Sequence, residues 1–254
     1  MSNDHFSAIA DGYARYRPGY PPALYDWLAS LPGRRELAWD CATGSGQAAV
    51  GLAGRFRRVA ATDFSAAQIA RAEARPGVEY RVAPADASGL PGSAVDLITV
   101  AQALHWFDLP AFYAEARRVL APGGVVAAWC YNLLDAGPRV NAVVGRYYSG
   151  VVGEYWPPER RLLEAGYRTL PFPFREVEPP RFEMTAEWTL GHLLGYLGTW
   201  SATERYRRVR GEDPLALVEP GLREAWGDPE QARRVRWPLY LRVGYGDDRS
   251  ARIA

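Results

Sequence analysis

Short apolar runs alternate with segments of helical periodicity over the first half of the chain. Five runs have the length of strands, at 36–41, 58–63, 78–83, 95–100 and 125–130. Helical spacing of small and apolar residues falls between them, at 47–54, 65–74 and 109–120. Strands that alternate with helices in this way are typical of βαβ units. The pattern therefore predicts an open, doubly wound α/β sheet of mostly parallel strands with right-handed crossovers.

The alternation breaks down after residue 132. Five further segments carry helical or strand patterns: helices at 138–170, 185–196 and 213–226, and strands within 174–184 and at 235–245. The first of these helical segments is interrupted by the prolines of Trp156-Pro157-Pro158. No linker-like composition precedes the last strand. We therefore expect this strand to close the edge of the same sheet in antiparallel orientation, which makes the chain a single domain.

The composition excludes several kinds of chemistry. Thirty basic residues against 29 acidic ones leave a net charge of +1, so no global field attracts nucleic acid or an anionic membrane. All thirty basic residues are arginine, which excludes a Walker-A lysine, a Schiff-base lysine and a Tyr-x-x-x-Lys hydride-transfer pair. Two cysteines and three scattered histidines exclude a disulfide framework and a Cys-ligated zinc site, and show no metal-ligand spacing.

The chain also lacks the patterns of a secreted or membrane-spanning protein. Its first residues show no basic segment followed by an apolar run, and no stretch approaches 18 uninterrupted apolar residues. We therefore expect a cytoplasmic protein that makes no use of a membrane.

A glycine-rich loop, Asp40-Cys-Ala-Thr-Gly44-Ser-Gly46-Gln, joins the first predicted strand to the first helix. Two glycines one residue apart let the backbone turn sharply and approach a ligand without an intervening Cβ. The loop falls at the carboxyl end of a parallel strand, where ligands bind in open α/β sheets. Gly-x-Gly also occurs in ordinary turns, so the loop alone is compatible both with a nucleotide-type ligand site and with a simple turn.

Asp63 ends the second predicted strand, nineteen residues after Gly44. At this position an acidic side chain accepts hydrogen bonds from the two hydroxyls of a ribose. Taken alone, Asp63 is equally typical of a turn that ends a strand. Together the loop and Asp63 favour a cofactor that contains a ribose.

Polar and aromatic residues follow the third and fourth strands. Asp86 and Ala87 are placed to offer a carboxylate and a backbone amide to the edge of a base, although a solvated turn is an equally simple reading. Gln102, His105 and Trp106 cluster just past the fourth strand, where we expect them to line a pocket. A single histidine is more often structural, so a ligand contact by His105 is a hypothesis.

The residues before the loop help to choose between cofactors. Gly-x-Gly-x-x-Ala with a downstream aspartate also suits NAD, but the chain lacks the lysine of short-chain hydride transfer. Asp40 is the first residue of this segment and precedes its glycines, where a carboxylate opposes a pyrophosphate and suits a cationic ligand. S-adenosylmethionine carries an adenosine at one end and a sulfonium and an ammonium at the other. The order of features therefore favours S-adenosylmethionine.

The ordered motifs resemble those of class I S-adenosylmethionine-dependent methyltransferases. The resemblance rests on Asp-Cys-Ala-Thr-Gly-Ser-Gly-Gln at 40–47, Ala-Thr-Asp-Phe-Ser at 61–65, Ala-Asp-Ala at 85–87, Ala-Gln-Ala-Leu-His-Trp-Phe-Asp at 101–108 and Arg-Val-Leu-Ala-Pro-Gly-Gly at 118–124. More narrowly, the chain is similar to the subgroup that includes trans-aconitate methyltransferase-like proteins. That likeness extends to 13–21, 196–201 and Trp237-Pro-Leu, and so covers most of the chain.

The resemblance implies a cofactor-binding role for fifteen residues. They are Tyr13, Arg17, Asp40, Ala42, Thr43, Gly44, Gly46, Gln47, Asp63, Phe64, Gln68, Asp86, Ala87, Gln102 and Trp106. The loop and Gln47 would hold the methionine part, Asp40 would orient its amino group, and Asp63 would bind the ribose hydroxyls. Phe64 and Gln68 would flank the adenine, and Asp86 and Ala87 would read its edge.

The other predicted cofactor contacts lie at the methyl-donor side and over the site. Gln102 and Trp106 would line the methionine and methyl-donor side, and Tyr13 and Arg17 would belong to a lid. Ala42 departs from the family pattern, which has glycine at this point of the loop.

The resemblance also implies a Rossmann-like architecture with four segments. They are N-terminal lid helices at 1–34, a cofactor-binding core at 35–132, a substrate-cap insertion with an edge strand at 133–234, and the closing strand at 235–246.

Methyl transfer from a sulfonium is an in-line displacement, in which the protein mainly supplies alignment and exclusion of water. A carboxylate acceptor is already ionised at pH 7, whereas a hydroxyl or amine needs help to lose a proton, and His105 is the candidate catalytic residue. We expect a small-molecule acceptor, with carboxylates among the candidates, and Arg146 or Arg205 as possible clamps. The products would be S-adenosylhomocysteine and the methylated acceptor.

Three alternatives stay open at this point. Arginine clusters at 55–58, 205–210 and 233–236 are compatible with an RNA or protein methyltransferase, although the near-neutral net charge argues against nucleic acid. A non-catalytic regulatory protein that binds S-adenosylmethionine can share the same fold. A nicotinamide-dependent oxidoreductase is the remaining alternative.

Overall fold

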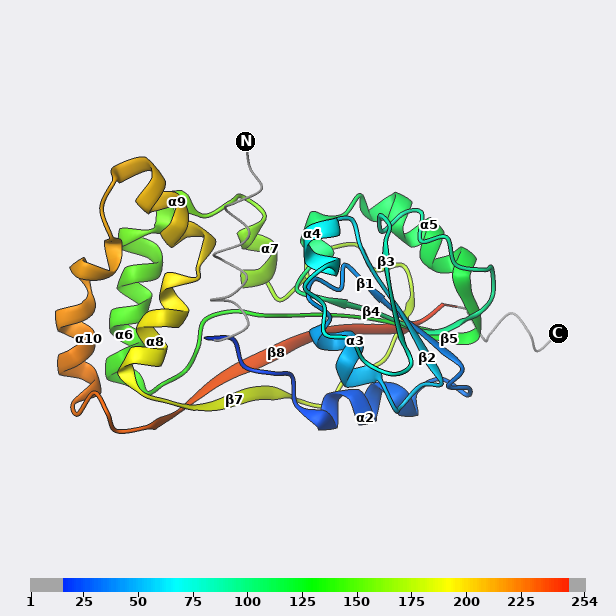
Figure 1. The fold of residues 1–254 in the computed structure, drawn as a ribbon, viewed down its shortest axis with the longest axis horizontal. Helices are drawn as coiled ribbons and strands as arrows, with labels where there is room; N and C mark the ends of the chain where they lie inside the picture. The colour runs from blue at the N-terminus through cyan, green and yellow to red at the C-terminus, as the bar shows by residue number, and fades with distance from the viewer. Residues whose placement is uncertain (1–15, 247–254) are drawn as a thin grey trace. The chain divides into compact units, whose positions relative to one another are not determined.

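The computed structural model describes residues 16–246 of the chain (Figure 1). Its contacts divide these residues into two compact units. The sheet unit contains residues 20–132, 161–182 and 238–246, and the helical unit contains residues 16–19, 133–160 and 183–237. The predicted boundaries of lid, core and cap stay a prediction.

The sheet unit is built on a mostly parallel sheet with the order β3-β2-β1-β4-β5-β8-β6. Its parallel strands are β1 (Leu37–Cys41), β2 (Arg58–Asp63), β3 (Val78–Val82), β4 (Val95–Ala101) and β5 (Leu120–Tyr131). The last strand, β8 (Arg233–Tyr245), runs antiparallel along β5 and also pairs with the short β6 (Arg175–Glu176). This arrangement confirms the predicted doubly wound sheet with an antiparallel closing strand.

Six short helices accompany this sheet. They are α2 (Pro22–Ser30), α3 (Gln47–Leu52), α4 (Ala66–Ile69), the 3₁₀ turn η1 (Leu104–Trp106), α5 (Leu109–Val119) and α7 (Arg160–Glu164). Side-chain caps fix where two of them begin, because Ser65 accepts a hydrogen bond at the start of α4 and Asp108 does so at the start of α5. The helix predicted at 65–74 is shorter than expected, since α4 ends at Ile69.

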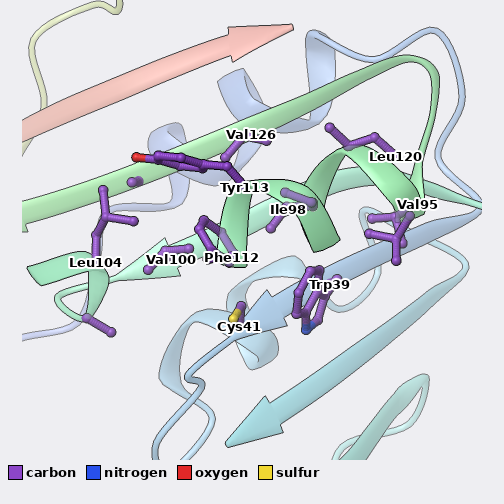
Figure 2. Packing of buried hydrophobic residues seen from close by; sticks show 14 of the residues in the cluster. Trp39, Cys41, Val95, Ile98, Val100, Leu104, Phe112, Tyr113, Leu120 and Val126 are labelled. Carbon is purple, nitrogen blue, oxygen red and sulfur yellow. The ribbon is translucent and has the colours of Figure 1, made fainter. Parts of the chain in front are cut away.

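The core of the sheet unit lies between α5 and one face of the sheet (Figure 2). Trp39 and Cys41 of β1 face Phe112 of α5, and all three are buried. Because neighbouring residues of a strand point to opposite faces, Asp40 projects to the other face of the sheet. Alternation along β1 thus separates the core residues from the polar residue that precedes the glycine-rich loop.

The helical unit is an assembly of helices with a short strand. Its elements are α6 (Pro138–Arg146), the π-helical turn η2 (Tyr147–Val151), η3 (Gly153–Tyr155), β7 (Glu183–Trp188), α8 (Leu190–Gly198), α9 (Ser201–Arg210), η4 (Pro214–Leu217) and α10 (Glu219–Trp226). Aromatic rings fill its interior, where Tyr196 packs against Trp188, Trp200 and Trp237.

Two sequence-based predictions in this unit were wrong. The helix expected from residue 185 begins only at Leu190, because Met184 and Trp188 are buried in alternation on the strand β7, and Thr189 caps the helix that follows. The helix α9 was not predicted at all. Its arginine-rich sequence hides the helical period, which only the buried Ala202, Thr203 and Tyr206 show.

Candidate functional site

The glycine-rich loop connects β1 to α3 at the carboxyl edge of the sheet. Three of its residues have positive φ: Ala42 at 55°, Gly44 at 57° and Gly46 at 91°. The amide of Thr43 donates to the carbonyl oxygen of Thr62 at 2.9 Å, which ties the loop to the end of β2. The left-handed conformation of Ala42 explains why the family pattern has glycine there, since only glycine adopts it without a steric cost.

Asp63 is buried at the end of β2 and binds the same loop. One carboxylate oxygen accepts a hydrogen bond from the amide of Gly44 at 2.9 Å, and the other accepts from the amide of Ser65 at 2.8 Å. An ionised carboxylate has about four lone-pair sites, so both oxygens keep capacity for a further donor. The loop and the carboxylate, which the sequence analysis singled out separately, are therefore in direct contact, and the carboxylate can accept hydrogen bonds from two hydroxyl groups.

Asp40 lies beneath the loop and is completely buried. Its carboxylate accepts hydrogen bonds from the hydroxyls of Thr43 and Thr99. Burial raises the pKa of Asp40 to about 6, although both hydroxyls act in the opposite direction. The carboxylate is thus held under the loop by its neighbours, and it would act on a cationic ligand through its charge rather than through an exposed surface.

Exposed apolar side chains flank Asp63 at the ends of β2 and β3. Phe64 is 80% exposed, and Val82, which pairs with Asp63 in register, is 57% exposed. Asp86 and Ala87 lie exposed in the turn after β3, and Gln68 is half-buried in α4. Apolar faces next to polar edge groups are suited to a flat aromatic ligand such as a purine base.

The end of β4 carries the second predicted cluster. Gln102 has a φ of 59°, and its side-chain amide donates to the carbonyl oxygen of Tyr131 at 3.3 Å. The side-chain oxygen of Gln102 is buried and has no hydrogen-bond partner among residues 16–246. Trp106 is 59% exposed, and its ring packs against that of His105 with centroids 4.6 Å apart and a tilt of 44°. An unsatisfied buried acceptor indicates a missing donor, which a water or a ligand can supply.

Some predicted residues lie elsewhere. Tyr13 falls outside the described residues. Arg17 belongs to the helical unit, where its guanidinium lies over the ring of Tyr196 at 5.4 Å from the centroid. Arg146 and Arg205 are both exposed in that unit. The lid and clamp roles of these residues stay predictions.

Three residues of the site escaped sequence reasoning. Thr99 is a buried hydroxyl in β4, and the ring of Tyr80 in β3 packs over Gly46, where a Cβ would lie 2.3 Å from the Tyr80 hydroxyl. Tyr167 binds His105 from 62 residues away. A polar residue inside an apolar strand is a usable signal for Thr99, whereas nothing near Tyr167 in the sequence points to His105.

Replacing Gly46 with alanine is expected to destabilise the fold by about 2–4 kcal/mol, because the Cβ combines a positive φ with a clash against Tyr80. The matched variant Gly44→Ala meets no atom within 4 Å and should cost only about 1–2 kcal/mol. Denaturant unfolding of both variants measures the difference. Equal losses would show that Tyr80 does not restrict Gly46.

Known proteins share this sequence and fold. A family model described as a methyltransferase domain matches residues 39–128, from β1 into β5. A Dictyostelium discoideum protein named a methyltransferase is 33% identical over 94% of this chain and 94% of its own length. An uncharacterized methyltransferase of Mycobacterium tuberculosis is 33% identical over 87% of this chain and 89% of its own.

A solved structure supports the same assignment. A protein of Anaeromyxobacter dehalogenans, described as a type II methyltransferase, is 52% identical and has a TM-score of 0.87, covering 91% of this chain and 98% of that one. Within the described part of the chain, no helix is long and apolar enough to cross a membrane, and no three side chains form a metal-binding group. Likeness along nearly the whole length, in sequence and in fold, shows that the chain belongs to the class I S-adenosylmethionine-dependent methyltransferases.

Proposed function

We propose that this methyltransferase moves the methyl group of S-adenosylmethionine to a small acceptor that carries a carboxylate. The observation that carries the cofactor part is the contact between the buried Asp63 carboxylate and the amide of Gly44 at 2.9 Å. It joins an acceptor of ribose hydroxyls to a loop that a ligand backbone can approach closely. Gly44 supports this fit, since no atom lies within 4 Å of the position of a Cβ.

The residues around this contact fit the rest of the cofactor. Phe64 offers an exposed ring beside Asp63, suited to the adenine face, and Asp86 lies in the exposed turn beyond it. The buried charge of Asp40 favours a cation over the loop, and the unsatisfied oxygen of Gln102 can accept a hydrogen bond from an ammonium. When bound, the cofactor supplies a methyl group on a sulfonium, which is a good leaving group.

The protein's part in the reaction is then mostly positional. Holding donor and acceptor in line can contribute about 7–11 kcal/mol to lowering the barrier. Asp63 and the loop fix the nucleoside, while His105 lies at the end of β4 beside the exposed Trp106. We assign His105 to the acceptor, as a hydrogen-bond partner of its reacting end.

The arginine clusters support a small acceptor rather than RNA. Five of their ten guanidinium groups are paired with acidic side chains: Arg55 with Asp26, Arg57 with Glu36, Arg207 with Glu204 and Asp213, Arg234 with Glu183, and Arg236 with Asp135. Groups paired in this way are less available to phosphates. The pairing of these five groups, together with the near-neutral net charge, lowers the attraction of the clusters for nucleic acid.

Transfer of labelled methyl groups tests the proposal directly. The protein is incubated with methyl-labelled S-adenosylmethionine and with small carboxylic acids, alcohols, amines or tRNA in separate reactions. We expect label in the carboxylic acids, as methyl esters that alkali releases. Label in tRNA alone, or binding of the cofactor without transfer to any acceptor, would overturn the proposal.

Replacing His105 with alanine is expected to raise the KM for the acceptor by about 10–100-fold, the value of one hydrogen bond to a charged group. Affinity for S-adenosylmethionine should stay within about threefold, because the other predicted contacts are intact. Unchanged kinetics for His105→Ala would assign this histidine to the scaffold.

A further inference from the structure

His105 and Tyr167 form a partly buried polar pair inside the sheet unit. The imidazole Nδ1 of His105 and the hydroxyl oxygen of Tyr167 lie 2.9 Å apart, within hydrogen-bond distance. Their rings are 5.9 Å apart between centroids and tilted by 32°. His105 is half-buried in η1, whereas Tyr167 is completely buried and belongs to the hydrophobic core beneath α5. The pair therefore links a residue at the site edge to a fixed point in the core.

Tyr167 is held in place by contacts that do not involve His105. Its φ is 60°, directly after Gly166 at 59°, so the chain keeps an unfavourable conformation for a bulky residue. Its amide donates to the carbonyl oxygen of Leu162 at 2.9 Å, and its carbonyl oxygen accepts from the guanidinium of Arg242 at 2.9 Å. Backbone strain that surroundings maintain in this way is typical of functional sites.

Arg242 is fixed in turn by Glu176. Two guanidinium nitrogens of Arg242 donate to the two carboxylate oxygens, each at 2.7 Å. Such a bidentate pair is geometrically specific. The Tyr167 hydroxyl thus has a position set by the core and by β8, and His105 must adapt to it.

The chemistry of the two groups decides the direction of the hydrogen bond. A phenol has a pKa near 10 and is a good donor, and an unprotonated imidazole nitrogen is a good acceptor. We propose that Tyr167 is a positioning residue whose hydroxyl donates to Nδ1 of His105 and keeps the ring proton on Nε2. In this tautomer His105 acts as a donor at Nε2 and takes no proton from the acceptor.

The inference rests on the proposed function and extends it, because this tautomer of His105 favours one class of methyl acceptor over the others. A hydroxyl or amine that must lose a proton needs a base, whereas a carboxylate is already ionised and benefits from a donor. The carboxylate oxygen then forms a bond to the methyl carbon, the bond from carbon to sulfur breaks, and its electron pair goes to sulfur. No proton is released. The pair of Tyr167 and His105 therefore specifies an anionic acceptor.

The tautomer can be measured without any substrate. Long-range ¹H–¹⁵N correlation spectra distinguish protonated from unprotonated ring nitrogens, and the chain has only His5, His105 and His192 to assign. Each signal is assigned by a His→Gln variant. For the full-length protein we expect Nε2 of His105 to carry the proton and Nδ1 to be unprotonated. In Tyr167→Phe we expect both tautomers in exchange.

Tyr113→Phe is the matched control. Tyr113 is a buried tyrosine of the same core, and its hydroxyl donates to the carbonyl oxygen of Pro171 at 2.7 Å. This variant should lose a comparable hydrogen bond and leave the His105 spectrum unchanged. With a carboxylate acceptor, Tyr167→Phe should raise KM about tenfold with little change in kcat, whereas Tyr113→Phe should change neither.

A proton on Nδ1 in the wild-type protein would overturn the proposal, because the hydroxyl would then be the acceptor. A Tyr167→Phe spectrum identical to that of wild type would overturn it as well. Failure of the proposed function has a different signature, since the spectra would show the expected tautomer while no carboxylic acid became labelled.

Discussion

Replacing Asp63 with alanine is expected to weaken binding of S-adenosylmethionine at least about 100-fold. Each hydrogen bond from a ribose hydroxyl to the carboxylate contributes about 1.5–3 kcal/mol, and two such bonds are lost. The variant also removes the acceptor of the hydrogen bonds that the amides of Gly44 and Ser65 donate to Asp63 at 2.9 and 2.8 Å. Titration calorimetry of the folded variant measures the change in Kd.

Asp96 provides the matched control for this experiment. It is a buried aspartate of the same sheet, and its carboxylate accepts hydrogen bonds from the amides of Glu36 and Leu37. These residues lie at the end of β1 opposite to the glycine-rich loop. Asp96→Ala should lower the free energy of unfolding by about 1–3 kcal/mol, as Asp63→Ala does, but leave the Kd for the cofactor unchanged. A Kd for Asp63→Ala within about threefold of the wild-type value would show that Asp63 only braces the loop.

Replacing Asp40 with asparagine is expected to have opposite effects on stability and on cofactor affinity. The folded pKa of Asp40 is about 6 and its ordinary value is 3.8. Between these two pH values the unfolded chain has lost a proton that the folded protein keeps, so stability falls as pH rises. The loss of folding stability amounts to roughly 3 kcal/mol and is complete above pH 6. Asparagine removes this cost and can still bond both Thr43 and Thr99.

Denaturant unfolding as a function of pH measures the stability effect. We expect the free energy of unfolding of Asp40→Asn to exceed that of the wild type by up to about 3 kcal/mol at pH 7.5 and to equal it near pH 4. Glu115, whose pKa is lowered from 4.5 to about 2 mainly by its hydrogen bond with Arg118, loses its contribution as pH falls below 4.5, and it does so in both proteins, so the difference between them is unaffected. Affinity for S-adenosylmethionine should fall by more than about tenfold, or 1.4 kcal/mol, because the cation loses a buried negative partner.

Thr99→Val is the control for the Asp40 experiment. It removes one of the two hydroxyls that donate to the carboxylate, so the ionised form is less well compensated. Stability at pH 7.5 should therefore decrease, opposite in sign to the effect of Asp40→Asn. Equal stability of Asp40→Asn and wild type across this pH range would contradict the account of a costly buried charge.

The strands and the order of motifs were predictable because local pattern decides them. Short apolar runs in the sequence predict β1, β2, β4 and β5. The loop with Gly44 and Gly46 lies where a parallel strand is followed by a helix. The loop and Asp63 were each predicted as cofactor-binding features, whereas the hydrogen bond between them was not predicted. Such features depend on a few neighbouring residues and on the general geometry of parallel sheets.

The features that escaped prediction depend on contacts between distant residues. Tyr167 reaches His105 across 62 positions, and its conformation is set by Arg242 from the closing strand. The burial of the Asp40 side chain likewise depends on tertiary contacts, since Thr99 of another strand donates a hydrogen bond to its carboxylate. Helix α9 was missed because its apolar face is narrow and lies among arginines. The narrower resemblance to trans-aconitate methyltransferase-like proteins, and the roles assigned to Tyr13 and Arg17, stay predictions.

A crystal structure of the protein with S-adenosylhomocysteine tests the central claim most directly. The account predicts that both ribose hydroxyls donate to the carboxylate of Asp63, that the homocysteine part lies over Gly44 and Gly46, and that the adenine contacts Phe64. A nucleoside bound elsewhere on the sheet unit, with the Asp63 carboxylate touching only the amides of Gly44 and Ser65, would contradict it.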